Sequence, residues 1–441
     1  MSIAAEEVVE LLQQLIRNAC VNDGTPSSGG EVRSVDTLDG YLGMSAERFE
    51  PAPGRVSGVY RIPGLGSAPA LMLMGHTDVV PAGAGWSVDP FAAERREGFV
   101  WGRGAIDMLD QTAAMAATFK RYAAGAERYP GDLVFLAVAD EEAGGRLGAR
   151  WLVDEHWDAV ATDYLVGEIG TPALQGKKGA GIPVTVAEKG PQWRRLHAAG
   201  IAGHGSQPYR TANAVVPIAD AIAHLAANPP AATITEEWRR FVAAWDPPDS
   251  DALLDPARVA DAIERIAASD LGLARWVHAC THLTVSPNVV HGGIKANVVP
   301  DQAMAEIDVR SLPGQDAGAV AEHFRRAIGS DFDGLGYEVV EATAASGSAP
   351  EGPLWEAIAG ALGELAPGRH LIPTLIPVGT DARFFRPKGV VAYGVGLMDD
   401  RMAFGDFLRM FHGPDERVSE ASLGLTAELY LRTVQRLGAM G

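Results

Sequence analysis

The chain has 441 residues, which is long enough for two domains that each bury a core. Its 56 acidic and 37 basic side chains give a net charge of −19, which disfavours binding to nucleic acid or to an anionic membrane. The two cysteines, Cys20 and Cys280, cannot build a disulfide framework or a cysteine-rich metal site. A bound metal would therefore have to use His, Asp and Glu.

The first residues do not resemble a targeting segment. Glu6 and Glu7 lie where a signal peptide needs a basic start and an uninterrupted apolar stretch. No part of the chain has the roughly 18 apolar residues that cross a bilayer. We therefore expect a cytoplasmic protein without a membrane partner. Apolar residues at helical spacing predict an amphipathic helix over residues 4–19.

Short apolar runs alternate with helical segments along the first part of the chain. The pattern predicts strands over residues 69–76, 131–139 and 163–167 and a helix over 111–125. This alternation is typical of an α/β fold, with a mainly parallel sheet and helices on both faces. Ligands of such sheets bind at the carboxyl ends of the strands, so we look first at the polar residues that follow these runs.

The pattern changes at about Gln192 and returns to α/β at about Pro350. Between these points the expected order is β-α-β-β-α-β, with the helices on one face of the sheet. We predict a catalytic domain built from residues 1–190 and 350–441, with a second, α+β (ferredoxin-like) domain inserted at 191–349. Residues 228–280 are additional material, partly Pro-rich and partly helical, to which the pattern assigns no function.

Candidate catalytic residues follow two of the predicted strands. His76 and Asp78 are two positions apart, so an extended backbone would place both side chains on one side, as suits a metal ligand and the group that orients it. The alternative is a satisfied histidine at a polar strand end. Glu141 and Glu142 are adjacent and begin two positions after the strand predicted at 131–139. Adjacent carboxylates repel unless a cation or a shared proton stabilises them.

Three more segments contribute similar residues. Asp107 lies in a glycine-flanked turn before the predicted helix, Glu168 ends the strand at 163–167, and His412 lies near the C-terminus. Asp163 is an alternative to Glu168, but its place at the start of the strand disfavours it. Nitrogen and oxygen ligands without sulfur suit zinc or, less selectively, cobalt or manganese. Two metals sharing one carboxylate would activate a water, and a carboxylate off the metals would act as the base.

Six motifs now indicate a family: GHTDVVPAG (75–83), WGRGAIDM (101–108), DEEAGG (140–145), NVVPD (297–301), GTDAR (379–383) and HGPDE (412–416). They resemble the dinuclear zinc amidohydrolase and exopeptidase family of aminoacylase-1, carboxypeptidase G, acetylornithine deacetylase and succinyl-diaminopimelate desuccinylase. The resemblance covers nearly the whole chain. It implies a zinc-peptidase-like α/β/α catalytic domain, an inserted lid or dimerisation domain, and two zinc ions per chain.

The resemblance also assigns roles at the metal site. It implies five ligands, divided between two metals: His76 and Glu168 on one, Glu142 and His412 on the other, and Asp107 as the bridge. Glu141 becomes the general base, and Asp78 becomes the partner that orients His76. The family further has a cis peptide after its bridging aspartate, which here would join Asp107 and Met108.

Residues outside the metal cluster receive roles on the same basis. His204, in GHGSQP, matches a histidine that reaches an active site, often that of the neighbouring subunit, and would donate to the oxyanion in a homodimer. Asn297 and Arg310 match positions that bind the substrate carboxylate, for which the planar guanidinium of Arg is suited. Thr380 and Asp381 are expected to line the pocket.

The resulting hypothesis is an enzyme that cleaves an amide bond next to a free-carboxylate amino acid, with a metal-bridged water as nucleophile and Glu141 as base. The substrate would be an N-acyl amino acid, a dipeptide or a C-terminal residue, and the motifs do not choose among these. The additional residues 228–280 favour a peptide-type or bulky acyl substrate. Two alternatives are a non-catalytic metal-binding protein that keeps this scaffold and an oligomeric scaffold with structural metals, and the presence of Glu141 disfavours the first.

Overall fold

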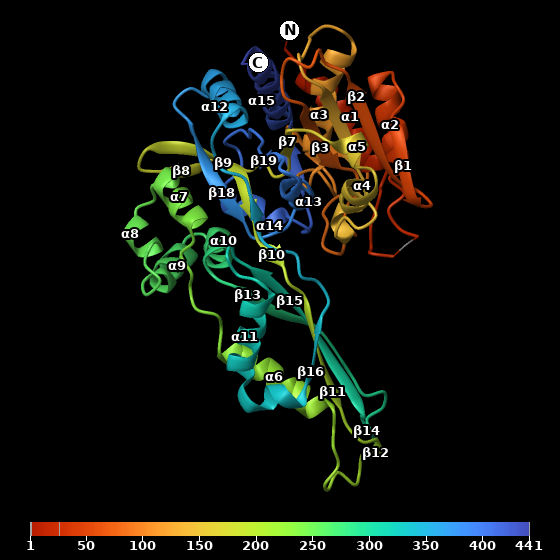
Figure 1. Ribbon diagram of the computed structural model, residues 1–441, viewed down its shortest axis with the longest axis vertical. Coiled ribbons are helices and arrows are strands. Elements are labelled where there is room, and N and C mark those ends of the chain that lie inside the picture. The colour runs from red at the N-terminus through yellow and green to blue at the C-terminus, as the bar shows by residue number, and fades with distance from the viewer. Residues whose placement is uncertain (1, 26, 441) are drawn as a thin grey trace.

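The computed structural model describes residues 2–25 and 27–440. A broad α/β body holds both ends of the described chain, and a narrower α+β domain projects from it (Figure 1). Among the described residues, no helix combines the length and apolar character needed to cross a membrane.

One mixed sheet of ten strands forms the centre of the body. Its strands are β1 (Glu47–Ala52), β2 (Arg55–Ile62), β3 (Leu71–His76), β6 (Leu133–Val138), β7 (Tyr164–Gly167), β8 (Leu174–Gly176), β9 (Gly179–Glu188), β17 (Ser346–Gly347), β18 (His370–Ile376) and β19 (Val391–Gly394). The order is β1-β2-β6-β3-β7-β19-β9-β17, and β8 and β18 also pair with β9. The strands predicted at 69–76, 131–139 and 163–167 are confirmed as β3, β6 and β7, which run parallel.

Helices cover both faces of this sheet, as the apolar periodicity predicts. One face packs against α1 (Ala5–Arg17), α2 (Val32–Leu42), α3 (Leu109–Ala123), α12 (Pro353–Leu365) and α15 (Glu420–Ala439). The other face packs against α4 (Ala149–Glu155), α5 (Trp157–Val160) and α13 (Ala382–Phe385). The helices predicted at 4–19 and 111–125 are thus α1 and α3. The α/β/α layering expected for the catalytic domain is present.

The projecting domain has a second, antiparallel sheet. Its main strands are β13 (Thr284–Gly292), β15 (Gln302–Ser311), β11 (Arg194–Ala199) and β16 (Gly336–Val339), in that spatial order, with β10 (Gly190–Pro191) also paired to β15. Helices α6 (Val215–Ala227) and α11 (Ala317–Ile328) cover one face (Figure 1). Burial alternates along β15, as a sheet with one covered face requires. The predicted β-α-β-β-α-β arrangement is confirmed, while the residue boundaries at 190 and 350 stay predictions.

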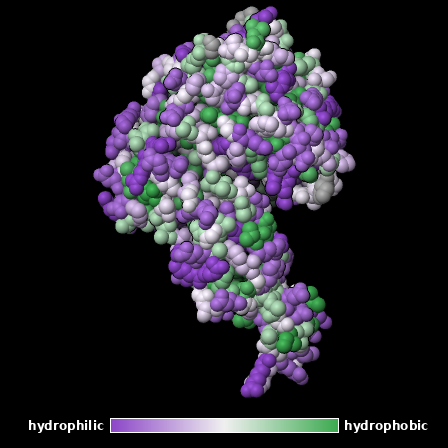
Figure 2. Space-filling view, viewed as in Figure 1, coloured by the Kyte–Doolittle hydropathy of each residue, from purple (hydrophilic) through white to green (hydrophobic). Residues whose placement is uncertain are grey.

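Two short strands, β12 (Gly203–His204) and β14 (Val298–Val299), pair at the far tip of the projecting domain (Figure 1). The face in Figure 2 is mostly hydrophilic, with apolar groups near this tip. The exposed fractions of Ile201, Tyr209 and Ile294 are 69%, 81% and 95%. All three lie in the segments next to β12 and β14, and exposed apolar side chains that gather in one place are typical of a surface that contacts another molecule.

The additional residues 228–280 pack on the body. They form α7 (Glu236–Trp245), α8 (Ser250–Leu253), α9 (Val259–Ala267) and α10 (Leu271–Thr281). Helix α7 lies against β18, and α10 lies against α14 (Phe404–Met410). Trp238, Phe241 and Trp276 form a buried aromatic cluster, in which the ring centroids of Phe241 and Trp276 are 4.8 Å apart. This segment therefore extends the body beside the sheet edge that carries β9 and β18.

Candidate active site

Six of the predicted side chains meet beside the carboxyl ends of β3, β6 and β7: His76, Asp107, Glu141, Glu142, Glu168 and His412. The carboxylate of Asp107 lies between the two histidines, with Oδ1 3.3 Å from His76 Nε2 and Oδ2 3.3 Å from His412 Nε2. On the first side Glu168 Oε2 is 3.7 Å from His76 Nε2, and on the second Glu142 Oε2 is 3.2 Å from His412 Nε2. Each oxygen of Asp107 thus faces a different histidine, an arrangement that suits a carboxylate shared by two metals.

Glu168, and not Asp163, lies at the end of β7 that faces the metal cluster. Glu168 directly follows β7 at its carboxyl end, whereas Asp163 precedes β7 and accepts a hydrogen bond from the backbone N–H of Ala70 at 2.8 Å. Parallel strands place all their carboxyl ends at one edge, so only Glu168 lies on the side of the sheet where His76 lies. Asp163 has a structural role at the opposite edge.

This cluster fits divalent metal ions. Candidate ligand atoms lie within 4.8 Å of one another in the groups His76–Asp107–Glu142 and His76–Glu141–Glu168. Among the described residues, the buried Glu142 Oε1 has no hydrogen-bond partner, which leaves an oxygen free to ligate. Imidazole and carboxylate donors without sulfur suit zinc, cobalt or manganese.

The electrostatics of the cluster also favour a cation. Burial raises the pKa of Glu141 well above its ordinary value, and the nearby charges of Glu168 and Asp381 raise it further. Burial raises the pKa of Glu168 in the same direction. Side-chain hydrogen bonds to Asp107 and Glu142 raise the pKa of His412 to about 10, so metal binding at this imidazole must displace a proton. A divalent cation would relieve the repulsion among these buried carboxylates.

Local packing places His76 and Asp107. A Cβ added to Gly75 would lie 2.3 Å from Thr112 Oγ1, so the absence of a side chain lets α3 approach β3 here. Thr112 Oγ1 then donates to the backbone oxygen of His76 at 2.9 Å. The peptide bond from Asp107 to Met108 is cis, as the resemblance implies, and the bond from Glu168 to Ile169 is a second cis peptide that no sequence pattern indicated.

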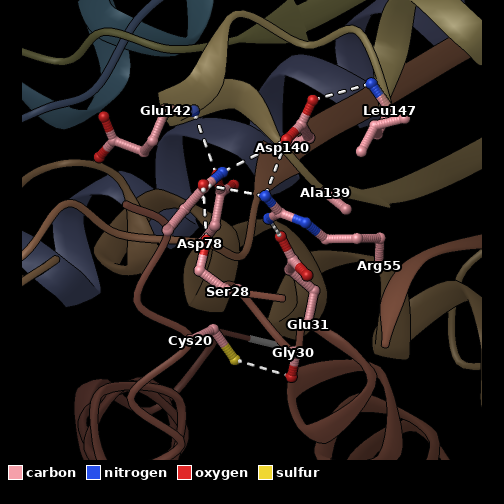
Figure 3. Close-up of polar contacts among 12 residues, drawn as sticks. Cys20, Ser28, Gly30, Glu31, Arg55, Asp78, Ala139, Asp140, Glu142 and Leu147 are labelled. Carbon is pink, nitrogen blue, oxygen red and sulfur yellow. Dashed lines mark hydrogen bonds and ion pairs between the residues drawn. The ribbon is translucent and has the colours of Figure 1, made fainter. Parts of the chain in front are cut away.

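Asp78 contacts His76 and the loop that carries Glu141 and Glu142, and Figure 3 shows its contact with Glu142. Its backbone oxygen is 2.9 Å from His76 Nδ1, whereas its carboxylate Oδ1 is 3.8 Å from that nitrogen. The carboxylate accepts hydrogen bonds from the backbone N–H of Glu141 at 3.3 Å and of Glu142 at 3.1 Å. Asn22 Nδ2 donates to the same carboxylate at 2.9 Å. Asp78 is therefore a positioning residue for three of the predicted site residues.

Beneath Asp78 lies a buried network that sequence reasoning missed (Figure 3). The Arg55 guanidinium pairs with Glu31 Oε1 at 2.6 Å and Asp140 Oδ1 at 3.1 Å, and donates to Asn22 Oδ1 at 2.9 Å. Asp140 has a φ of +70° and accepts from the Leu147 backbone N–H at 2.8 Å, which turns the chain after β6. The signal in the sequence was the acidic motif at 140–145, where only the two glutamates were singled out.

A cleft of about 630 Å³ lies over the metal cluster and is lined by both domains. Arg310 and Trp193 contribute from the projecting domain, and the Arg310 guanidinium is 5.9 Å from the Trp193 ring centre. Arg146, Arg150 and Arg383 line the cleft from the body. The same cleft is also lined by six carboxylates: Asp23, Asp107, Glu141, Glu142, Glu168 and Glu341. The four guanidinium groups therefore suit one anionic group of a ligand whose other part binds at the metal cluster.

The remaining predicted residues lie in two places, either beside the metal cluster or at the tip of the projecting domain. Thr380 and Asp381 line a small cavity with ligands of the cluster, and burial raises the pKa of Asp381 to about 7. His204 and Asn297 do not line the cleft or that cavity. They lie together at the tip of the projecting domain, where the backbone N–H of Gly205 donates to the oxygen of Asn297 at 2.8 Å. One chain therefore does not bring these two residues to the metal cluster.

The fold and the cluster together define a metallohydrolase, because histidine and carboxylate ligands gather at the carboxyl edge of an α/β sheet beneath an inserted domain. The model of peptidase family M20/M25/M40 matches residues 72–436, and the chain belongs to this family. The resemblance drawn from the six motifs is thereby confirmed.

Individual relatives agree. Aminoacylase-1B of Rattus norvegicus is 27% identical over 439 residues, which cover 98% of this chain and 95% of the relative. Succinyl-diaminopimelate desuccinylase of Phenylobacterium zucineum is 29% identical over 441 residues, which cover 98% and 99%. An M20 family metallo-carboxypeptidase from Sulfolobus solfataricus has the same fold, with a TM-score of 0.75, 16% identity, and coverage of 98% of this chain and 99% of that one. Metal-dependent amide hydrolysis is therefore the general activity of this chain.

Proposed function

We propose that this chain hydrolyses the amide bond next to a free-carboxylate amino acid, in an N-acyl amino acid, a dipeptide or the C-terminus of a peptide. The observation that carries the proposal is that one cleft holds both the candidate metal ligands and a set of arginines. Glu141 lies beside His76 and Glu168, and arginines line the same cleft. The histidine and carboxylate cluster would hold the metals at which the amide is cleaved. A guanidinium group would pair with the substrate carboxylate.

The metals would be held by the predicted ligands, with zinc expected and cobalt or manganese as alternatives. His76, Glu168 and Asp107 would bind one ion, and Glu142, His412 and Asp107 the other. When bound, two such ions lower the pKa of a water and polarise the amide carbonyl.

Glu141 then carries the proton. Its carboxylate takes a proton from the attacking water as the new C–O bond forms, and returns it to the leaving nitrogen as the C–N bond breaks. Arg383 Nη1 is 3.8 Å from Glu141 Oε1. Bound metal cations would oppose the burial that raises the pKa of Glu141, and so favour the charged carboxylate before the transfer. Asp78 accepts a hydrogen bond from the backbone N–H of Glu141, which keeps the Glu141 carboxylate close to the position of the reacting carbonyl.

The projecting domain completes the site in this proposal. Arg310 reaches the cleft of its own chain and pairs with the substrate carboxylate, while Thr380 and Asp381 line the pocket around the ligands. His204 and Asn297 would come from the partner in a homodimer. The exposed apolar side chains at the tip support this association, which we place in the cytoplasm.

The test is release of free amino acids, followed by mass spectrometry, from a mixed panel of N-acyl amino acids and dipeptides. Zinc-reconstituted protein is expected to release amino acids, and protein kept in chelator is the control. The same substrates with the carboxylate converted to an amide should react much more slowly, because the arginines then lose their partner. No release from any substrate by protein that carries two metals per chain would favour the alternative, a metal-binding protein without turnover.

A further inference from the structure

A second cavity, of about 580 Å³, adjoins the cleft over the metal cluster. The two share Ile169, Val378 and Phe411 in their walls. Ile169 directly follows Glu168, and Phe411 directly precedes His412. A molecule bound at the metal ligands can therefore extend into this cavity.

The walls of this cavity are mostly apolar and come from both parts of the body. Helices α10 and α14 and the strands β9 and β18 with their continuations supply Trp276, Ala279, Phe404, Leu408, Pro183 and Ile376. No acidic side chain lines it, and its two cationic residues, Arg275 and Arg409, are exposed at the surface. Thr171 also lines the cavity, and its hydroxyl is buried without a hydrogen-bond partner among the described residues.

Helix α10 is fixed in place, so the cavity is preformed. A Cβ added to Gly272 would lie 2.7 Å from the backbone oxygen of Gly405, which shows that α10 and α14 touch through their backbones. The buried Lys189 Nζ donates to the backbone oxygens of Ala279 at 2.8 Å and His282 at 2.7 Å, which secures the last turn of α10. A preformed apolar site binds its ligand without a large ordering cost.

We infer that this cavity binds a bulky apolar acyl group, such as a medium-length alkyl chain or an aromatic ring, on the carbonyl side of the scissile bond. The inference rests on the proposed function for the direction of the substrate. The carboxylate end of that substrate is matched by arginines in the main cleft. In the apolar cavity a carboxylate would find cationic partners only where Arg275 and Arg409 are exposed, and deeper inside it would lose hydration without gaining a partner. Helix α10, from the additional residues 228–280, thus supplies one wall of an acyl pocket.

The acids that such acyl groups release are probes that need no turnover. Acetate, hexanoate and octanoate are titrated by calorimetry into zinc-loaded enzyme. Each methylene buried is expected to tighten binding about fourfold, so burial of only three of the six added methylenes should make octanoate bind about 60-fold more tightly than acetate. Suberate, which replaces the apolar end of octanoate by a second carboxylate, should show no such gain.

Two variants narrow the cavity from different helices. Ala279→Leu and Leu408→Trp are each expected to abolish most of the chain-length gain while acetate binding is unchanged, with folding checked by thermal unfolding. Ala268→Leu makes the first substitution at an exposed position outside the cavity and should keep the full gain. Equal affinity for acetate and octanoate, or a gain that survives both cavity variants, would overturn the inference. Suberate binding as tightly as octanoate would also overturn it, because the cavity would then take an acidic group.

Turnover of N-acetyl and N-octanoyl amino acids is measured separately. A chain-length gain in binding without any release would support the cavity assignment and count against the proposed hydrolysis. Release from acetylated substrates without any chain-length gain in binding or in KM would support the hydrolysis and contradict the acyl pocket.

Discussion

Glu141→Gln is expected to lower kcat by about 100- to 10,000-fold while the protein keeps its metals. The amide of Gln has nearly the shape of the carboxylate, but it cannot accept the proton of the attacking water or deliver it to the leaving nitrogen. The predicted ligands are untouched by this change, since Glu141 is assigned no metal. The measurement combines steady-state kinetics on a released amino acid with metal content by elemental analysis.

A matched control for this prediction is Glu155→Gln, which makes the same substitution at an exposed position of α4. It should leave both kcat and metal content at the wild-type level. Full activity of Glu141→Gln would remove the base assignment. Loss of metal together with activity would instead make Glu141 a ligand.

Arg103→Met is expected to lower the free energy of unfolding by about 3–5 kcal/mol, because it leaves a buried carboxylate without its partner. Arg103 Nη1 is 2.6 Å from Glu416 Oε2, and both side chains are almost fully buried. Arg103 Nη2 also donates to the backbone oxygens of His412 at 3.2 Å and Gly413 at 3.1 Å. Glu416 Oε1 in turn accepts from the Ile106 backbone N–H at 2.8 Å. The ion pair therefore joins the loop of His412 to the segment that leads into Asp107.

Chemical denaturation of the wild type and of Arg103→Met measures the change in the free energy of unfolding. The metal content of the variant should also fall, because the loop of His412 separates from the segment before Asp107. Arg240→Met removes an exposed ion pair with Glu236 and is the control, with an expected change below about 1 kcal/mol. If Arg103→Met unfolds within about 1 kcal/mol of the wild type, the buried pair does not hold the two loops together.

The position of the metal cluster follows from strand ends that the sequence marks clearly. The apolar runs before His76, Glu141 and Glu168 are long enough to be buried strands, and their parallel pairing brings the next residues to one edge. Asp107 and His412 are candidates by residue type alone, and only the resemblance implies their roles as ligands, because neither follows a strand of the central sheet. Their meeting depends on long-range contacts that no local pattern records.

The residues that support the cluster were not predictable from local patterns. Asn22, Glu31 and Arg55 are dispersed single polar residues, and only the fold makes them one buried network beneath Asp78. The role of residues 236–281 also depends on packing. An amphipathic pattern indicates which face of a helix is buried, but it does not indicate which element that face packs against. The distance between His204 and the cluster likewise follows from the length of the projecting domain, which periodicity does not encode.

Two metals that share Asp107 are expected to be required for amide hydrolysis. Zinc is titrated into chelator-treated protein, and both bound zinc and amino-acid release from one accepted substrate are followed. Release should rise to a plateau at two zinc ions per chain, and Asp107→Asn should reach neither that stoichiometry nor that rate. A plateau at one zinc per chain, or equal release by protein without metal, would show that a shared pair of metals is not required.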